Sequence, residues 1–158
     1  MVFFVFTIGG MFEVIRRTAE AAKAVRGAHN TWILDDGRSP DVEEVAHQVG
    51  VRYLTREGNE GAKAGNINHA LTKTNGEFVV IFDCDHVTTR AFLQMTVGWF
   101  QRDAELALLQ TPHHFYSRDP IQRNFTMLGE LPGEGALFYD VVQDGNDFWN
   151  ASFFCGSC

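Results

Sequence analysis

The fold is decided by residues 76–88, which read Gly-Glu-Phe-Val-Val-Ile-Phe-Asp-Cys-Asp-His-Val-Thr. Residues 78–82 form an uninterrupted apolar run rich in β-branched and aromatic side chains, which is typical of a strand buried on both faces of a parallel sheet. Asp83 and Asp85 follow directly. If the extended geometry continues for one more step, both carboxylates leave the backbone on the same side. They then lie just beyond a carboxyl strand end, where open α/β sheets bind ligands.

Such a pair of carboxylates suits a hard divalent cation. Mg²⁺ typically takes one or two carboxylates and fills its other positions with water and phosphate oxygens. We therefore predict that Asp83 and Asp85 bind a hard divalent cation such as Mg²⁺. The alternative is that both acidic residues lie in a solvated loop, because Asp-x-Asp is a short motif.

Composition limits the classes of protein to consider. A chain of 158 residues fits one domain and can bury roughly 70% of its unfolded surface. The chain has 13 basic and 20 acidic residues, and the basic ones form no run, which argues against nucleic acid as a partner. The apolar run at 2–8 is shorter than the ~20 residues that span a bilayer, and no basic segment precedes it, so we expect a soluble piece.

The cysteines favour a reducing compartment. There are three, Cys84, Cys155 and Cys158, and a sparse, odd number argues against a disulfide scaffold. The last two form Cys-x-x-Cys, but the chain stops there instead of opening a helix. His113-His114 is the one other pair at ligand spacing, so neither a redox role nor a zinc site is favoured.

Strand and helix patterns alternate along the chain. Strands are predicted at 2–7, 31–34, 51–55, 78–82, 106–110 and 150–154. Helices are predicted at 11–25, 67–73, 89–100, 121–131 and 136–142. A further helix is predicted to begin at Pro40, with Ser39 as its N-cap. This alternation is the signature of right-handed βαβ units, so we predict an α/β fold with a mainly parallel sheet and helices on both faces. A natural domain rarely stops immediately after a strand, so we expect a fragment of a longer protein.

Polar groups also follow two earlier predicted strands. Asp35-Asp36-Gly37 comes after the second strand, with a glycine that permits a tight turn. Residues 56–66 follow the third strand and contain three glycines and Lys63 before a helix, an arrangement that favours a phosphate. Each motif alone also fits an ordinary turn or a solvated side chain. Together, three strand ends of this kind predict one crevice for a nucleotide diphosphate and its metal.

Several short motifs, in their order and spacing, resemble the catalytic core of bacterial cellulose synthase, an inverting, processive family 2 glycosyltransferase. They are Asp-Asp-Gly at 35–37, Lys-Ala-Gly-Asn at 63–66, Asp-Cys-Asp-His at 83–86, Gln-Thr-Pro at 110–112, Phe-Tyr-Asp at 138–140 and Phe-Phe-Cys-Gly-Ser at 153–157. The resemblance runs from about residue 30 to the end. It implies a Rossmann-like GT-A fold and a single glycosyltransferase domain over residues 1–158.

The resemblance also implies roles on the donor side. Asp36, or its neighbour Asp35, is expected to hold the uridine of UDP-glucose, and Lys63 the diphosphate. Asp83 and Asp85 are expected to hold the metal-bound diphosphate, which makes them, with Asp36, the candidate catalytic residues. When an acceptor hydroxyl attacks the anomeric carbon, negative charge builds on the departing diphosphate, and Mg²⁺ or Mn²⁺ together with the lysine would neutralise it.

Four further residues receive roles from the same resemblance. His86 is expected to assist at the cation. Phe153, Phe154 and Cys155 are expected where the growing glucan end meets the donor sugar. The apolar faces of glucose stack on aromatic rings, while packing in a core is the alternative for one of the two phenylalanines, because an alternating strand buries one face.

The chain departs from the family in three places. After its first strand it reads Thr-Ile-Gly-Gly-Met-Phe at residues 7–12, where the family has Thr-Tyr-Asn-Glu-Pro. It ends before the family's Thr-Glu-Asp and Gln-x-x-Arg-Trp motifs, so no general base is assigned and the piece is not expected to polymerise glucose. The parent protein is expected at the cytoplasmic face of the bacterial inner membrane, integrated in it with other cellulose synthase subunits.

Two other classes of function stay open. A metal-dependent sugar nucleotidyltransferase also places carboxylates beside a Rossmann-like sheet, but it does not account for residues 153–157. A non-catalytic nucleotide-binding module is suggested by the altered segment after the first strand.

Overall fold

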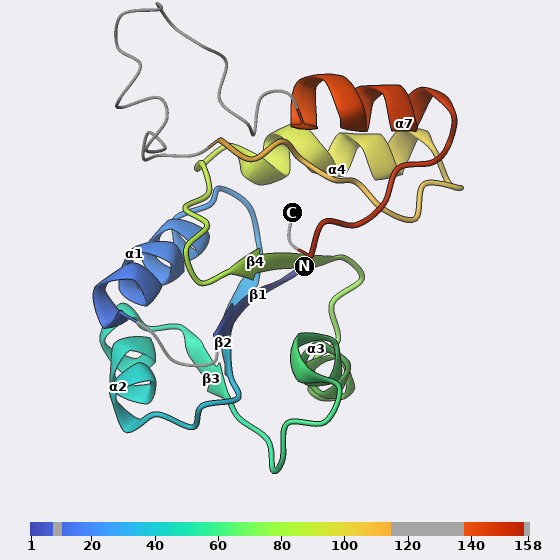
Figure 1. Ribbon diagram of the computed structural model, residues 1–158. Helices are drawn as coiled ribbons and strands as arrows, with labels where there is room; N and C mark the ends of the chain where they lie inside the picture. Colours follow the sequence, from blue (N-terminus) through green and yellow to red (C-terminus); the bar gives the residue numbers. More distant parts are fainter. Residues whose placement is uncertain (8–10, 115–137, 157–158) are drawn as a thin grey trace, which may run out of the picture. The chain divides into compact units, whose positions relative to one another are not determined.

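The computed structural model describes residues 1–7, 11–114 and 138–156 (Figure 1). These residues form two compact units, Met1–Ala107 and Leu108–Gly156.

The first unit is built on a parallel sheet. Within the described residues, the sheet has four strands in the order β3-β2-β1-β4, and every neighbouring pair is parallel. The strands are β1 (Val2–Thr7), β2 (Asn30–Asp35), β3 (Arg52–Leu54) and β4 (Val79–Asp83). The first four predicted strands are therefore confirmed, each within two residues at either end.

Helices cover both faces of this sheet, as the sequence predicts. They are α1 (Phe12–Lys23), α2 (Pro40–Val49), α3 (Ala62–Lys73) and α4 (Phe92–Arg102). Figure 1 shows α1 and α2 side by side on one face and α3 on the other. The first unit is thus an α/β layer structure of the Rossmann type.

Alternation along β1 explains how the two faces are filled. Phe4 faces α3, where it forms a buried cluster with Leu34 and Ala70. Its neighbour Phe3 faces the other way and is fully buried. The centre of its ring lies 5.7 Å from the centre of the Phe82 ring. Each such phenylalanine contributes about 1.5–3 kcal/mol by its burial. A strand that is apolar on both faces therefore lies in the middle of the sheet.

Helix α3 begins five residues earlier than the sequence predicts. The expected start was residue 67, but the helix includes Ala62 and Lys63 in its first turn. Gly61 precedes it with a left-handed φ of 71°, a conformation that glycine adopts without strain. The first turn consists mostly of small residues and lacks apolar side chains at helical spacing, so the sequence pattern did not predict it as helix. Lys63 therefore lies on a helix, not in the loop before it.

The start of α2 differs from the prediction in how its N-cap residue is bonded. Ser39 occupies the N-cap position and Pro40 the first turn, as predicted, but the serine side chain makes no capping hydrogen bond. Its main-chain N–H donates instead to Oδ2 of Asp35, at 2.8 Å. The end of β2 is therefore joined to the start of α2.

Two predicted strands are wrong. Neither 106–110 nor 150–154 forms a strand in the structure. An apolar run becomes a strand only when a partner lies beside it, and residues 106–110 span the boundary between the two units. Residues 150–154 are all exposed, so they lack the buried face on which the expected alternation depends.

The second unit contains two short helical segments in its described part. A π-helix, η2 (Phe138–Gln143), leads into α7 (Asp144–Phe148). The first overlaps the helix predicted at 136–142, whereas the helix predicted at 121–131 lies outside the described residues. Across the described ranges, no helix combines the length and apolar character that crossing a bilayer demands.

Candidate functional site

The carboxyl ends of three neighbouring strands meet at one edge of the sheet. Strand β1 lies between β2 and β4, with Thr7 paired to Asp35 and Phe6 paired to Asp83. The main-chain N–H of Asp36 donates to the carbonyl of Thr7, at 3.2 Å. The carboxylates at the ends of β2 and β4 thus lie on either side of one strand, β1.

Strand alternation divides these carboxylates between two faces. Asp83 is in register with Phe6, whose ring packs on the α3 face, and so it belongs to that face. Asp35 is in register with Thr7, one residue further, and belongs to the opposite face. Asp36 then returns to the α3 face, where its carboxylate meets Arg56. Asp36 and Asp83 therefore share a face, as the predicted crevice requires.

Asp35 is fully buried and holds the turn that follows β2. Its Oδ1 accepts from the N–H of Gly37, and its Oδ2 accepts from the N–H of Ser39, each at 2.8 Å. The hydroxyl of Tyr53 donates to Oδ2 as well, at 2.9 Å. Burial, and then this carboxylate, raise the pKa of Tyr53. Three protein donors thus occupy Asp35, and its carboxylate fixes this turn.

Asp36 forms a two-pronged ion pair with Arg56. Nε of the arginine donates to Oδ1 at 2.8 Å, and Nη2 donates to Oδ2 at 2.9 Å. The side chains are only 9% exposed for Arg56 and 4% for Asp36. The hydrogen bonds to this carboxylate raise the pKa of the guanidinium. Sequence reasoning missed Arg56, because a single arginine after a strand has no pattern that separates it from a solvated side chain.

Lys63 extends from the first turn of α3 to the end of β4. Its ammonium forms an ion pair with Oδ1 of Asp83 and lies 5.8 Å from the centre of the Phe6 ring. The side chains are 25% exposed for the lysine and 38% for the aspartate, so solvent and ligands can reach both. A cation therefore already lies on the carboxylate that is predicted to bind a metal.

Strand β4 ends at Asp83, and Asp85 does not continue it. The N–H of His86 donates to the carbonyl of Asp83 at 3.0 Å, so the chain turns at once and the expected extended geometry is wrong. The side chain of Asp85 is 69% exposed, and its Oδ1 lies 3.7 Å from Nε2 of His86. Asp83 and Asp85 thus project from a turn that faces solvent.

This donor set suits a hard cation only in part. Among the residues that the structure describes, no three or more His, Cys, Asp or Glu side chains lie close enough together to enclose a metal ion. Mg²⁺ and Mn²⁺ do not need such an enclosure, since one or two carboxylates suffice when a phosphate supplies further oxygens. Asp83 and Asp85 fit that requirement, although a metal at Asp83 would share this carboxylate with the Lys63 ammonium.

Thr18 of α1 braces the same turn from the other face. Its hydroxyl donates to the carbonyl of Cys84 at 2.7 Å, and the threonine is fully buried. The Cys84 thiol is half-buried, and burial, followed by the charge of Asp85, raises its pKa. Sequence reasoning missed Thr18, because a threonine among alanines on an amphipathic helix looks like any other buried position.

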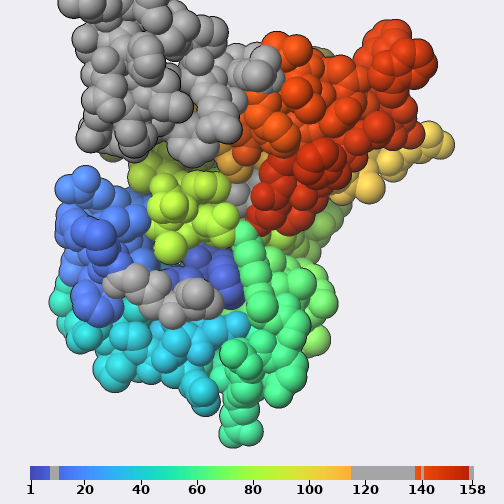
Figure 2. All heavy atoms as spheres, viewed as in Figure 1, coloured from blue at the N-terminus to red at the C-terminus, as the bar shows by residue number. Residues whose placement is uncertain are grey.

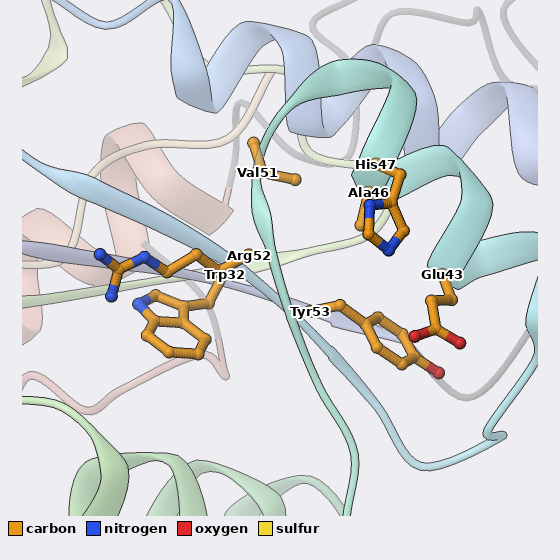
Figure 3. A pocket seen from close by; sticks show the side chains of 7 residues that line it. All are labelled: Trp32, Glu43, Ala46, His47, Val51, Arg52 and Tyr53. Carbon is orange, nitrogen blue, oxygen red and sulfur yellow. The ribbon is translucent and has the colours of Figure 1, made fainter.

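A separate hollow lies along the outer edge of β3. It has a volume of about 380 Å³ and is lined by residues of β2, β3 and α2. Figure 3 shows Trp32 and Arg52 on one side of the strand and Tyr53 with His47 on the other. The Arg52 guanidinium lies 5.0 Å from the centre of the Trp32 ring. None of the predicted site residues lines this hollow, so we do not assign it to the predicted site.

The predicted acceptor residues belong to the second unit. Phe153 and Phe154 are 51% and 37% exposed, which leaves both rings accessible. The N–H of Cys155 donates to Oε1 of Gln110 at 3.0 Å, and Nε2 of Gln143 lies 3.0 Å from its sulfur. Gln110, from the Gln-Thr-Pro motif, therefore holds the Phe-Phe-Cys segment in place.

Comparison with curated proteins finds close relatives among the cellulose synthases. The chain is 50% identical over 158 residues to the cellulose synthase catalytic subunit [UDP-forming] of Xanthomonas axonopodis pv. citri (strain 306), with 98% of this chain and 22% of that protein covered. It is 60% identical over 129 residues to cellulose synthase 2 of Novacetimonas hansenii, with 82% of this chain and 8% of that protein covered. The chain thus spans less than a quarter of the length of these relatives.

Solved structures agree on the fold. A mannosyltransferase from Pyrobaculum calidifontis, in complex with GDP-Man and Mn²⁺, aligns with a TM-score of 0.55 at 19% identity, over 63% of this chain and 31% of that one. A synthetase for CMP:2-keto-3-deoxy-manno-octonic acid, complexed with CTP, aligns with a TM-score of 0.53 at 15% identity, over 66% of this chain and 48% of that one. At such identities the likeness concerns the fold alone.

The family assignment rests on most of the chain. Residues 10–158 match the family described as Glycosyl transferase family 2, and this range contains the Asp36, Lys63 and Asp83 constellation at the sheet edge. The parallel sheet with helices on both faces agrees with this match. The chain belongs to glycosyl transferase family 2.

Proposed function

We propose that this chain is the donor-binding core of a cellulose synthase, which transfers glucose from UDP-glucose to the growing end of a β-1,4-glucan with inversion. The observation that carries the proposal is the pairing of Lys63 with Asp83 beside Asp36 at one sheet edge. Identity of 50% to a UDP-forming cellulose synthase catalytic subunit over 98% of the chain supports the same substrate.

The donor would lie across the carboxyl ends of β2, β1 and β4. Asp36 would face the uridine, with Asp35 fixing the turn beneath it. Lys63 would approach the diphosphate from the first turn of α3, where the positive end of the helix dipole also favours an anion. As charge develops on the departing diphosphate, the ammonium would stabilise it, which is the kind of preorganised electrostatic stabilisation that lowers a barrier most.

A divalent metal, Mg²⁺ or Mn²⁺, belongs to this proposal. Asp83 and Asp85 would bind it, with His86 beside them, and the structurally similar mannosyltransferase was solved with Mn²⁺. When bound, such a metal neutralises charge on the diphosphate. The role left to the chain is to present two accessible carboxylates on a braced turn.

The acceptor side of the proposal concerns the second unit. Phe153 and Phe154 would stack on glucose rings of the glucan, and Cys155, held by Gln110, would lie beside them. The parent protein would be integrated in the bacterial inner membrane with other cellulose synthase subunits. We assign no residue as general base.

A metal-dependent sugar nucleotidyltransferase is the second candidate. It is favoured by the fold shared with the CTP-bound synthetase, and it predicts release of pyrophosphate from a nucleoside triphosphate and a sugar phosphate. A non-catalytic nucleotide-binding module is the third. It predicts nucleotide binding without turnover even when the chain is part of the whole protein.

Isothermal titration with UDP and Mn²⁺ tests the leading candidate. We expect binding by the wild-type chain and loss of binding when Asp83→Ala is combined with Asp85→Ala. A matched control replaces two exposed acids elsewhere, Glu20→Ala with Asp41→Ala, so that the net charge changes equally. Wild-type binding by the Asp83 and Asp85 variant would overturn the proposal, as would equal losses in the control.

A further inference from the structure

Arg56 connects two parts of the candidate site that are distant in sequence. Besides its ion pair with Asp36, its Nη1 donates to the carbonyl of Glu60 at 2.8 Å and its Nη2 donates to the carbonyl of Ala62 at 2.9 Å. With two bonds to the carboxylate and one to each carbonyl, four of the five guanidinium N–H donors are used. One side chain thus ties the end of β2 to the loop that opens α3.

The loop that Arg56 holds is exposed and leads into a residue with a strained backbone. Residues 57–61 are all exposed, and Figures 1 and 2 show this loop as the lower tip of the first unit. Ala62 has a φ of 44°, a left-handed conformation that non-glycine residues adopt only at a cost. The hydrogen bond to its carbonyl offsets that cost.

Gly65 shows how closely the loop packs on the first turn of α3. A Cβ at this position would lie 2.0 Å from the carbonyl oxygen of Glu60 and 2.7 Å from Nη1 of Arg56. The backbone of the loop, the guanidinium and the helix are therefore in contact with no room for a methyl group. Movement of any one of them would displace the others.

Lys63 is adjacent to the residue that Arg56 fixes. Ala62 is held through its carbonyl, and the next side chain in the first turn extends to Asp83. The direction of the lysine thus depends on the position of the loop. Asp36, on the other side of the guanidinium, depends on the same side chain.

We propose that Arg56 is the positioning residue of the nucleotide-sugar site: it holds Asp36 and the Lys63 loop in the arrangement that receives the donor. The inference rests on the proposed function. The guanidinium acts through its neighbours, since its donors are engaged by protein acceptors. Lysine cannot replace it, because a single ammonium lacks the planar fork that binds a carboxylate and two carbonyls together.

The first test is Arg56→Lys, which keeps the charge. We expect the affinity for UDP with Mn²⁺ to fall about tenfold or more, as is usual when an outer partner of a binding group is lost. Arg17→Lys, at an exposed pair with Glu13 on α1, is the matched control and should bind as the wild type. Binding by Arg56→Lys equal to the wild type would overturn the proposal.

A second variant displaces the loop and leaves every charge in place. Gly65→Ala forces the carbonyl of Glu60 away and is expected to weaken UDP binding in the same sense as Arg56→Lys. Gly98→Ala in α4 is its control, because a Cβ there meets no atom within 4 Å. Unchanged binding by a folded Gly65→Ala chain would count against the proposal even if Arg56→Lys failed to fold.

A double-mutant cycle separates positioning from general stability. If Arg56 acts through Lys63, the loss caused by Arg56→Lys should shrink in a Lys63→Met background, since residues that act together are not additive. Full additivity of the two losses would refute the mechanism. A merely structural role would lower the melting temperature without producing this coupling.

Hydrogen exchange of residues 57–66 keeps the two proposals distinguishable, because it needs no nucleotide. Arg56→Lys should speed exchange in this loop selectively, relative to α1 and α2. Absence of nucleotide binding by the wild type, together with this selective exchange, would overturn the proposed function and leave the loop-holding role of Arg56 supported. Unchanged exchange would overturn that role.

Discussion

Replacing Thr18 by valine tests whether α1 holds the turn that carries the two candidate metal ligands. Valine keeps the shape of the side chain but removes the hydroxyl that donates to the carbonyl of Cys84 at 2.7 Å. Leaving a part-buried carbonyl without this donor costs about 1–2 kcal/mol. For a unit of this size, such a loss lowers the melting temperature by about 3–10 °C. Because Cys84 stands between Asp83 and Asp85, binding of UDP with Mn²⁺ should weaken as well.

Urea unfolding monitored by circular dichroism measures the free energy of unfolding. Titration with UDP and Mn²⁺ measures the binding affinity. Thr96→Val is the matched control. Its hydroxyl donates to the carbonyl of Phe92 within α4, at 2.8 Å, and that carbonyl keeps its place in the helix ladder, so we expect a cost well below about 1 kcal/mol. The reasoning is refuted if Thr18→Val is as stable as the wild type, or if Thr96→Val loses as much.

Lys63→Met should tighten the binding of Mn²⁺ alone, because Asp83 loses a competing cation, and should weaken the binding of UDP with Mn²⁺; shifts of the same sign in the two titrations would contradict this. Tyr53→Phe should cost about 1 kcal/mol at pH 7 in urea unfolding, for the hydrogen bond lost to Asp35. The folded state raises the pKa of this phenol, so its contribution to the free energy of unfolding is fully present below the unfolded pKa of about 10 and declines above it. The variant should therefore lose less stability than the wild type between pH 9 and 11. Parallel losses of stability in the two proteins would speak against this. Alkylation of Cys84 by iodoacetamide, in a chain whose other two cysteines are serine, should have its pH midpoint above that of a free thiol, because burial raises the pKa of this group; a midpoint at or below the free value would disprove this.

The sheet could be predicted from the sequence because each strand of the first unit carries its own signal. Apolar runs such as that of β1 and β4 are long enough, and bounded by enough turn residues, to be recognised without knowledge of their partners. The segments 106–110 and 150–154 have similar composition but form no strand. Pairing is a non-local property, so composition alone could not separate these segments from true strands.

The candidate site was predictable only where charge stands at a strand end. Asp83 follows an apolar run directly and Asp36 follows one after a single residue, and strand parity then places them on one face. The start of α3 was missed, because its first turn is built from small residues without apolar period. Lys63 was therefore expected in a loop, although a helix directs it toward Asp83.

The side chains that hold these carboxylates come from elsewhere in the chain. Tyr53 lies 18 positions from Asp35, Arg56 lies 20 positions from Asp36, and Thr18 lies 66 positions from the Cys84 carbonyl that it binds. No local window contains both members of such a pair, which is why a motif can show the carboxylate and conceal its partner.

This separation has a physical consequence for the site. Two candidate carboxylates are each held by a residue from another βα unit: Asp36 by one that follows β3, and Asp83 by one in the first turn of α3. The site therefore exists only when the sheet and its crossovers have packed together. A donor that bridges β2 and β4 would bind the packed state and not the unfolded chain, so its binding free energy would add to the stability of the whole first unit. The turn at Asp83 and the loop at Arg56 would then be stabilised together by the bound donor.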